Sequence, residues 1–223
     1  MPQKIALYYD IKEIDNRFKV QSESFEYKPR YNINPGQNVP IITNDEEAKC
    51  VMMRWGLVPG WSNDPLIGFQ LINAKSESIN QDKNFKNSLR EKRCIVPCSG
   101  FYLTKRIDRT TKKLFFVNSK DGNIFGFAGL WDIWGRDGGN LTTFTIVTTT
   151  ANNLIEGISD RMPVILYKED EQKWLDPNIQ DPAEVTPLLK AYTSEQMEVY
   201  EISNYVNRAE NEGPGCIEPI DVK

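Results

Sequence analysis

Short apolar runs bounded by polar and turn-forming residues recur along this chain, a pattern typical of β-strands rather than long helices. Residues 141–150 (LTTFTIVTTT) are the clearest case, because β-branched residues dominate them. Residues 114–134 predict a β-hairpin with Asp121 and Gly122 in its turn. Residues 21–37 are polar and contain prolines, so we expect a loop there. Further strands are predicted at residues 38–43, 50–58, 93–103, 163–167 and 197–203.

Helices are predicted to be few and short. Ile11, Ile14 and Phe18 have helical spacing behind Asp10, a possible N-cap. Further helices are predicted at residues 84–92, 151–158 and 168–175, the last with an acidic first turn. No alternation of strands with helices and no internal repeat is visible, which favours one α+β domain over residues 1–223. We expect a mostly antiparallel, barrel-like sheet with short flanking helices.

Composition narrows the possible chemistry. The 223 residues contain no apolar run of eighteen and no N-terminal signal-peptide pattern, so we expect a monomeric cytoplasmic protein, nucleoid-associated if bacterial, with no membrane partner. Histidine is absent, which removes the usual general base near neutral pH and the commonest metal ligand. We therefore expect neither a metal nor a cofactor. The four cysteines (Cys50, Cys94, Cys98 and Cys216) form no disulfide framework, as in a reduced cytosolic protein.

Charge is unevenly distributed, although the net charge is only -4. Residues 83–113 contain ten Lys or Arg and two acidic residues, whereas residues 168–223 contain thirteen acidic and five basic residues. This distribution favours a localised anion-binding face. A solvated surface loop would explain the basic stretch equally well.

An arginine and two tryptophans surround a Gly/Pro turn in residues 54–61 (RWGLVPGW). Aromatic rings beside a cation form a platform on which unpaired bases stack. The alternative is that Trp55 and Trp61 belong to the core, an even choice for either residue.

Two further polar clusters interrupt apolar runs. Residues 73–78 (NAKSES) could bond a phosphate or a sugar, or could supply a helix cap through Ser76 or Ser78. In residues 159–163 (SDRMP), Arg161 could hold a phosphate, or could pair with Asp160 or a neighbour. Without histidine, no Ser–His or Cys–His nucleophile pair can form.

These stretches, in this order, resemble the SRAP family (SOS-response-associated peptidase), which shields abasic sites in single-stranded DNA. The resemblance covers nearly the whole chain. It is carried by residues 31–42 (YNINPGQNVPII), 53–61 (MRWGLVPGW), 73–78 (NAKSES), 93–102 (RCIVPCSGFY), 127–134 (FAGLWDIW), 143–152 (TFTIVTTTAN), 160–166 (DRMPVIL) and 206–219 (VNRAENEGPGCIEP).

The resemblance implies a DNA-damage protein that binds single-stranded DNA at abasic sites. In that family the initiator Met is removed to expose a Cys at position two. The amine and thiol of this Cys close a thiazolidine on the ring-opened sugar aldehyde. An Asn, a Glu and a His assist, and the same residues are credited with removing N-terminal sequence, hence the word peptidase.

Carried over residue by residue, most of this catalytic set is missing. Pro2 stands at the Cys position, Leu103 at that of the Glu after GFY, and Ser159 at that of the His before DRMP. Asn73 is retained. Lys4 and Lys75 replace two arginines of the family pattern, which keeps charge but loses bidentate phosphate bonding. The substitutions predict a pseudoenzyme that has lost the covalent chemistry.

Three hypotheses follow. The leading one is a protein that binds single-stranded or damaged DNA without cross-linking it. The second is an abasic-site lyase, in which Pro2, once Met1 is removed, offers a secondary amine to the aldehyde. The third is a protein-interaction module that uses the cleft or the acidic tail. On the leading hypothesis, the expected DNA contacts are Lys4, Arg54, Trp55, Trp61, Asn73, Lys75, Ser76, Glu77, Arg90, Arg93, Arg161, Met162 and Pro163.

Overall fold

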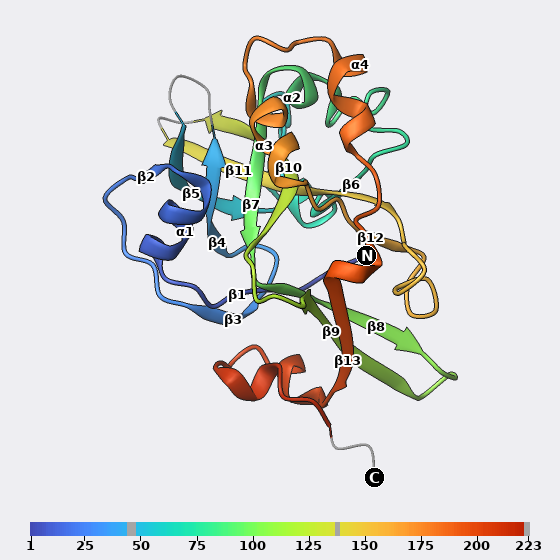
Figure 1. Ribbon diagram of the computed structural model, residues 1–223. Coiled ribbons are helices and arrows are strands. Elements are labelled where there is room, and N and C mark those ends of the chain that lie inside the picture. The colour runs from blue at the N-terminus through green and yellow to red at the C-terminus, as the bar shows by residue number, and fades with distance from the viewer. Residues whose placement is uncertain (44–47, 137–138, 221–223) are drawn as a thin grey trace.

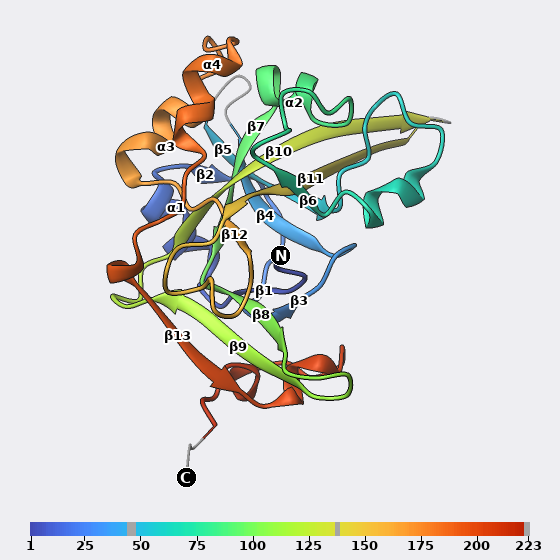
Figure 2. The same cartoon turned by 90° about the vertical axis from the view of Figure 1, so that its right-hand side faces the viewer.

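The computed structural model describes residues 1–43, 48–136 and 139–220, arranged around two β-sheets (Figures 1 and 2). The larger sheet closes on itself, because β11 pairs with β10 on one side and with β5 on the other. The closed order is β11–β10–β7–β4–β5, with all neighbours antiparallel except β11 and β5. The barrel strands are β4 (Asn38–Thr43), β5 (Lys49–Trp55), β7 (Arg93–Cys98), β10 (Phe125–Arg136) and β11 (Gly139–Thr150).

Three short strands extend the margins of this barrel. β2 (Gln21–Ser22) pairs with β5, while β6 (Asn73–Lys75) and β12 (Arg161–Pro163) both pair with β11. β6 and β12 both lie beside the end of β11, so segments distant in sequence meet there (Figure 1).

The second sheet is antiparallel throughout, in the order β13–β9–β8–β1–β3. Its strands are β1 (Ile5–Leu7), β3 (Arg30–Ile33), β8 (Gly100–Arg106), β9 (Lys112–Ser119) and β13 (Met197–Ile202). The chain passes from the barrel into this sheet at Ser99, between β7 and β8. Gly100 is required there, since a Cβ would lie 2.6 Å from the Val117 carbonyl oxygen and would overlap the Phe116 ring.

The helices are short and lie around the sheets. They are α1 (Ile11–Phe18), α2 (Lys86–Glu91), α3 (Lys168–Leu175) and α4 (Pro182–Val185), with 3-10 turns at Pro65–Phe69, Thr186–Leu188, Ser194–Gln196, Asn204–Asn207 and Pro214–Cys216. Asp10 caps α1 in a full capping box with Glu13, as the sequence indicated. No helix in the described ranges is both long and apolar enough to cross a membrane.

The strands predicted at 38–43, 141–150 and 197–203, and the helices at 10–18, 84–92 and 168–175, are confirmed in type. The hairpin at 114–134 was wrong. Its turn is present, with Gly122 at φ +67°, but β9 pairs with β8 and β13, while β10 pairs with β7 and β11. Residues 21–37 contain β2 and β3, and residues 151–158 form turns rather than a helix. The predicted strand at 163–167 is displaced to Arg161–Pro163, and the one at 93–103 is divided at Ser99.

Candidate functional site

The N-terminus of the chain lies between the two sheets, close to β12 (Figure 1). The Asn73 side chain in β6 donates from Nδ2 to the Pro2 carbonyl oxygen at 2.9 Å. The Met1 ammonium donates to Ser159 Oγ at 3.4 Å, and Thr148 Oγ1 lies 3.6 Å from Met1 Sδ. Three segments far apart in sequence therefore meet around the first two residues.

A cleft of about 490 Å³ opens at this point, within the range of small-molecule sites. The N-terminal segment contributes Met1 and Lys4, the smaller sheet contributes Leu103, and the loop before β12 contributes Ser159. Leu103 is only 2% exposed. Because neither Leu103 nor Ser159 carries an ionisable group, this part of the cleft offers no carboxylate or imidazole for proton transfer.

Two polar groups beside the cleft are incompletely satisfied. Burial lowers the pKa of the Met1 amine, with Asp160 opposing that shift and Arg161 adding to it. Asn73 Oδ1 is buried and has no hydrogen-bond partner among the described residues. An orphan buried acceptor is costly, and a donor from a bound ligand would relieve that cost.

Lys4 lines the same cleft and is held by two amides. Its Nζ donates to Asn32 Oδ1 at 2.9 Å and to Asn34 Oδ1 at 2.6 Å. Asn32 is itself fixed, since its Nδ2 donates to the carbonyl oxygens of Val206 and Arg208. Burial lowers the pKa of the Lys4 ammonium.

Arg161 is held by Glu77, not by Asp160. Its Nη1 and Nη2 donate to the two Glu77 oxygens at 3.1 and 2.8 Å, and Nη2 also donates to the Thr148 carbonyl oxygen at 2.6 Å. A phosphate approaching Arg161 would therefore meet the Glu77 carboxylate as well. Lys75 is exposed and Ser76 half-buried beside this pair, whereas Met162 and Pro163 are buried and cannot reach a ligand without movement.

The two tryptophans of residues 54–61 have different environments. Trp55 is 1% exposed and donates from Nε1 to the Ile72 carbonyl oxygen at 2.8 Å, so the prediction that it stacks on bases was wrong. Trp61 is 51% exposed, with Lys83 Nζ 5.0 Å from its ring centroid. Of the two, only Trp61 is accessible to a base.

Phe69 is an exposed aromatic residue that the sequence analysis missed. It is 54% exposed, and the Arg54 guanidinium lies 5.4 Å from its ring centroid. A Cβ on Gly36 would lie 3.2 Å from the ring of Phe69, so this ring lies next to the residue that follows Pro35, which lines the cleft. The only sequence signal for Phe69 is its place in a loop with Pro65 and Gly68, where an aromatic side chain can be exposed. No hydrophobic periodicity marks it.

The basic stretch 83–113 does not form one face. Arg93 is 6% exposed and donates to the carbonyl oxygens of Leu89, Arg90, Trp174 and Asp176, so its assignment as a DNA contact was wrong. Two groups remain at opposite ends of the molecule (Figures 1 and 2). One is at α2, with Lys83, Lys86 and exposed Arg90; the other is on the β8–β9 hairpin, with Lys105, Arg106, Arg109 and Lys112.

The four cysteines are buried and form no disulfide. Burial raises the pKa of all four thiols, that of Cys50 to about 12, so none is an activated nucleophile. The described residues contain no cluster of three or more His, Cys, Asp or Glu side chains that could hold a metal ion.

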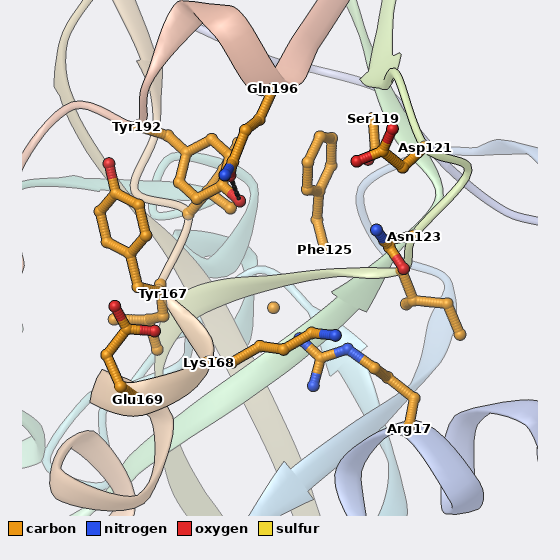
Figure 3. Close-up of a pocket in the computed structure, with 14 residues that line it drawn as sticks. Arg17, Ser119, Asp121, Asn123, Phe125, Tyr167, Lys168, Glu169, Tyr192 and Gln196 are labelled. Carbon is orange, nitrogen blue, oxygen red and sulfur yellow. Dashed lines mark hydrogen bonds between the residues drawn. The ribbon is translucent and has the colours of Figure 1, made fainter.

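A second cavity, of about 410 Å³, is lined by the turn before β10 and the start of α3 (Figure 3). Arg17 and Lys168 point into it from one side, and the rings of Phe125, Tyr167 and Tyr192 face it from the other. Arg17 is already paired with Glu171 at 2.6 Å. None of the site residues predicted from the sequence lines this cavity.

The protein is of the α+β class. It has a closed barrel, a second antiparallel sheet and a cleft that is lined by its own N-terminal residues. The chain belongs to the family described as SOS response associated peptidase (SRAP), whose sequence profile matches residues 1–209.

Relatives and solved structures agree with this assignment. The chain is 40% identical over 219 residues to abasic site processing protein YoqW of Bacillus subtilis, covering 96% of this chain and 98% of that protein. It is 28% identical over 230 residues to abasic site processing protein HMCES of Xenopus tropicalis, covering 89% of this chain and 68% of that one. A crystal structure of a Bacteroides thetaiotaomicron protein superposes with a TM-score of 0.89 at 28% identity, over 98% of this chain and 99% of that one.

Proposed function

We propose that this protein binds single-stranded DNA at abasic sites as part of the DNA damage (SOS) response, and that it has lost the permanent thiazolidine cross-link and the peptidase activity of its family. One observation carries the proposal: the segments bearing Pro2, Asn73, Leu103 and Ser159 surround one cleft. The cleft is therefore retained, while the thiol, carboxylate and imidazole that the chemistry requires are replaced.

The loss follows from the chemistry of the ring. A thiazolidine needs an amine and a thiol on the same residue, and Pro2 supplies no thiol. The four cysteines are buried with raised thiol pKa values, so none of them supplies the missing thiol. Ser159 Oγ donates to the Arg161 carbonyl oxygen at 2.8 Å, so it is a structural hydroxyl rather than a proton carrier.

Exposed aromatic residues and a basic hairpin support a path for a single strand. Exposed Phe69 lies beside the Arg54 guanidinium, and exposed Trp61 lies beside the Lys83 ammonium. The β8–β9 hairpin continues from Leu103 into the basic group of Lys105, Arg106, Arg109 and Lys112. Exposed aromatic rings flanked by cations suit unpaired bases and phosphates.

The relatives support the choice of lesion. The bacterial and vertebrate proteins described above are named abasic site processing proteins, and the bacterial match extends over almost all of both chains. We propose that this chain also acts on abasic sites in DNA. We also take residues 1–223 to act as one domain, as a monomer and in the cytoplasm.

The test is a comparison of affinities by fluorescence anisotropy. An abasic single-stranded oligonucleotide should bind more tightly than the matching duplex, and the affinity should fall steeply as salt rises. Equal affinity for both forms, or no binding at low salt, would contradict the proposal and favour the interaction module.

A Pro2 lyase is the second candidate, favoured by the place of Pro2 between Met1 and Gln3, which both line the cleft. It requires removal of Met1, because Pro2 is otherwise an amide without a free amine. The mass of the purified protein shows whether that removal occurs. A retained Met1 excludes this candidate.

A further inference from the structure

We infer that Lys4 captures the sugar aldehyde of an abasic site as a reversible imine, so that the protein holds the lesion covalently but not permanently. The inference rests on the proposed function, since it names the group of the same cleft that meets the lesion. It assigns the contact to a side-chain amine that needs no N-terminal processing.

Lys4 lines the cleft, and its amine is fixed by two hydrogen bonds. Asn32 Oδ1 and Asn34 Oδ1 accept two of its hydrogens, at 2.9 and 2.6 Å. A neutral amine has two N–H bonds and one lone pair at roughly tetrahedral angles. With both hydrogens bound to the amides, the lone pair is left free, and Lys4 lines the cleft together with Leu103 and Ser159.

The surroundings of Lys4 also favour its neutral, nucleophilic form. Burial lowers the pKa of this ammonium. In the part of the chain that the structure describes, no carboxylate forms an ion pair with Lys4 that would hold the proton. Desolvated lysines are the amines that proteins use for Schiff bases.

Asn32 acts as a positioning residue for this amine. Its Nδ2 donates to three carbonyl oxygens, of Val206, Arg208 and Asn211, at 3.0–3.1 Å. Those bonds fix the flip of the amide, so that Oδ1 and not Nδ2 faces Lys4. A lysine that only attracts a phosphate does not need its amine to be held by a fixed amide oxygen.

The step balances without a co-reactant. The Lys4 ammonium releases one proton to solvent, and the amine adds to the aldehyde carbon. The carbinolamine hydroxyl then takes up one proton from solvent and leaves as water, which gives a protonated C=N bond. Water later adds back and breaks that bond, which returns the lysine and the aldehyde unchanged. Strand cleavage would need a base for the adjacent carbon, which Leu103 and Ser159 do not supply.

The experiment is borohydride trapping with the full-length protein and an abasic single-stranded oligonucleotide, followed by peptide mapping. Borohydride reduces the protonated imine to a stable amine, so we expect an adduct with the DNA-derived mass on Lys4. Lys4→Arg keeps the positive charge but has no usable nucleophile, and it should reduce trapping at least tenfold. Lys12→Arg, on the exposed side of α1, is the matched control and should trap as wild type does.

The outcomes separate the inference from the proposed function. Binding by anisotropy without any trapped adduct would overturn the imine and leave the proposed function standing. An adduct mapped to Met1 or Pro2 would also overturn it. Absence of binding would contradict the proposed function itself. If Lys4→Arg does not fold, as judged by its thermal melting, the mapped position in the wild-type adduct decides alone.

Discussion

Trp55 and Trp61 belong to one eight-residue motif but have opposite environments. Trp55 packs against Phe144, with its ring centroid 6.4 Å away, and its indole N–H is used internally. Trp61 stands at the surface under Lys83. A motif can therefore contain one residue that builds the barrel and another that is free to contact a ligand.

Trp61→Ala should weaken binding to single-stranded DNA by about 1–3 kcal/mol, the usual contribution of one stacked base, with little change in stability. Trp55→Ala should lower the free energy of unfolding by about 3–5 kcal/mol, because it leaves a large cavity. Anisotropy and denaturant unfolding measure the two effects. If Trp61→Ala bound single-stranded DNA as tightly as wild type does but lost much of its stability, this division of roles would be contradicted.

Arg93 shows that a cation in a basic stretch can be an internal cross-link. Its guanidinium ties the end of α2 to the end of α3 through backbone carbonyl oxygens. Those oxygens lose their donors when the side chain is removed.

Arg93→Met should therefore lower the free energy of unfolding by about 3 kcal/mol, since several buried acceptors are left unsatisfied. Arg90→Met, three positions earlier and exposed, is the control and should stay within about 0.5 kcal/mol of wild type. Thermal melting of both variants provides the comparison. Equal stability of the two variants would show that the carbonyl cage contributes nothing.

At the scale of elements, local sequence patterns correctly predicted those helices and strands whose formation depends on nearby residues. The capped helix α1, the β-branched strand β11 and the acidic-start helix α3 follow from caps, periods and propensities, and all are present. The partners of β9 and β10 could not be predicted this way. The two strands follow one another across a turn at Gly122, yet each pairs in a different sheet, a choice set by packing of distant residues.

The site residues also fall into those that the sequence could predict and those that it could not. The resemblance identified Pro2, Asn73 and Ser159, and the structure brings their segments together. Burial of Trp55, Met162 and Arg93 depends on the packing of the whole barrel, so aromaticity, a motif and charge, respectively, did not reveal it. The role of Glu77 as the partner of Arg161 also depends on β11, whose Thr148 pairs with Lys75 of β6 and with Pro163 of β12.

The loop from residue 56 to residue 72 holds the exposed rings of Trp61 and Phe69 and depends on one close backbone approach. Gly56 has φ +116°, and a Cβ there would lie 2.6 Å from the Gly68 carbonyl oxygen. The backbone of Leu57 also donates to that of Leu71 at 3.2 Å.

Gly56→Ala should cost about 1–3 kcal/mol of stability through backbone strain. It should also weaken binding of single-stranded DNA, because Trp61 and Phe69 move with the loop. Gly139→Ala, where an added Cβ meets nothing within 4 Å, is the matched control. Unfolding and anisotropy measurements on both variants test this. Intact binding by a destabilised Gly56→Ala variant would separate the loop from the DNA path.

At the scale of the whole molecule, two sheets meet around the N-terminus. The proposed function holds that this arrangement is kept while three reacting groups are replaced. The fold supplies the position, and individual side chains supply or withhold the reaction.

Restoring the missing groups should therefore restore some chemistry. The triple variant Pro2→Cys, Leu103→Glu and Ser159→His should form a heat-stable adduct with abasic single-stranded DNA once mass measurement shows that Met1 has been removed. Leu103→Glu and Ser159→His without Pro2→Cys should form none, because no thiol closes the ring. Failure of a folded, processed triple variant would mean that more than these three groups separates this cleft from an active one.

The central claim is that the cleft recognises an abasic site without the permanent cross-link. The most direct measurement is a denaturing gel of wild-type protein incubated with abasic single-stranded DNA and heated, without borohydride, at concentrations where anisotropy shows full binding. We predict that all of the DNA migrates free of protein, since Pro2 cannot close a thiazolidine and an imine hydrolyses on heating. A heat-stable protein–DNA band would contradict the account.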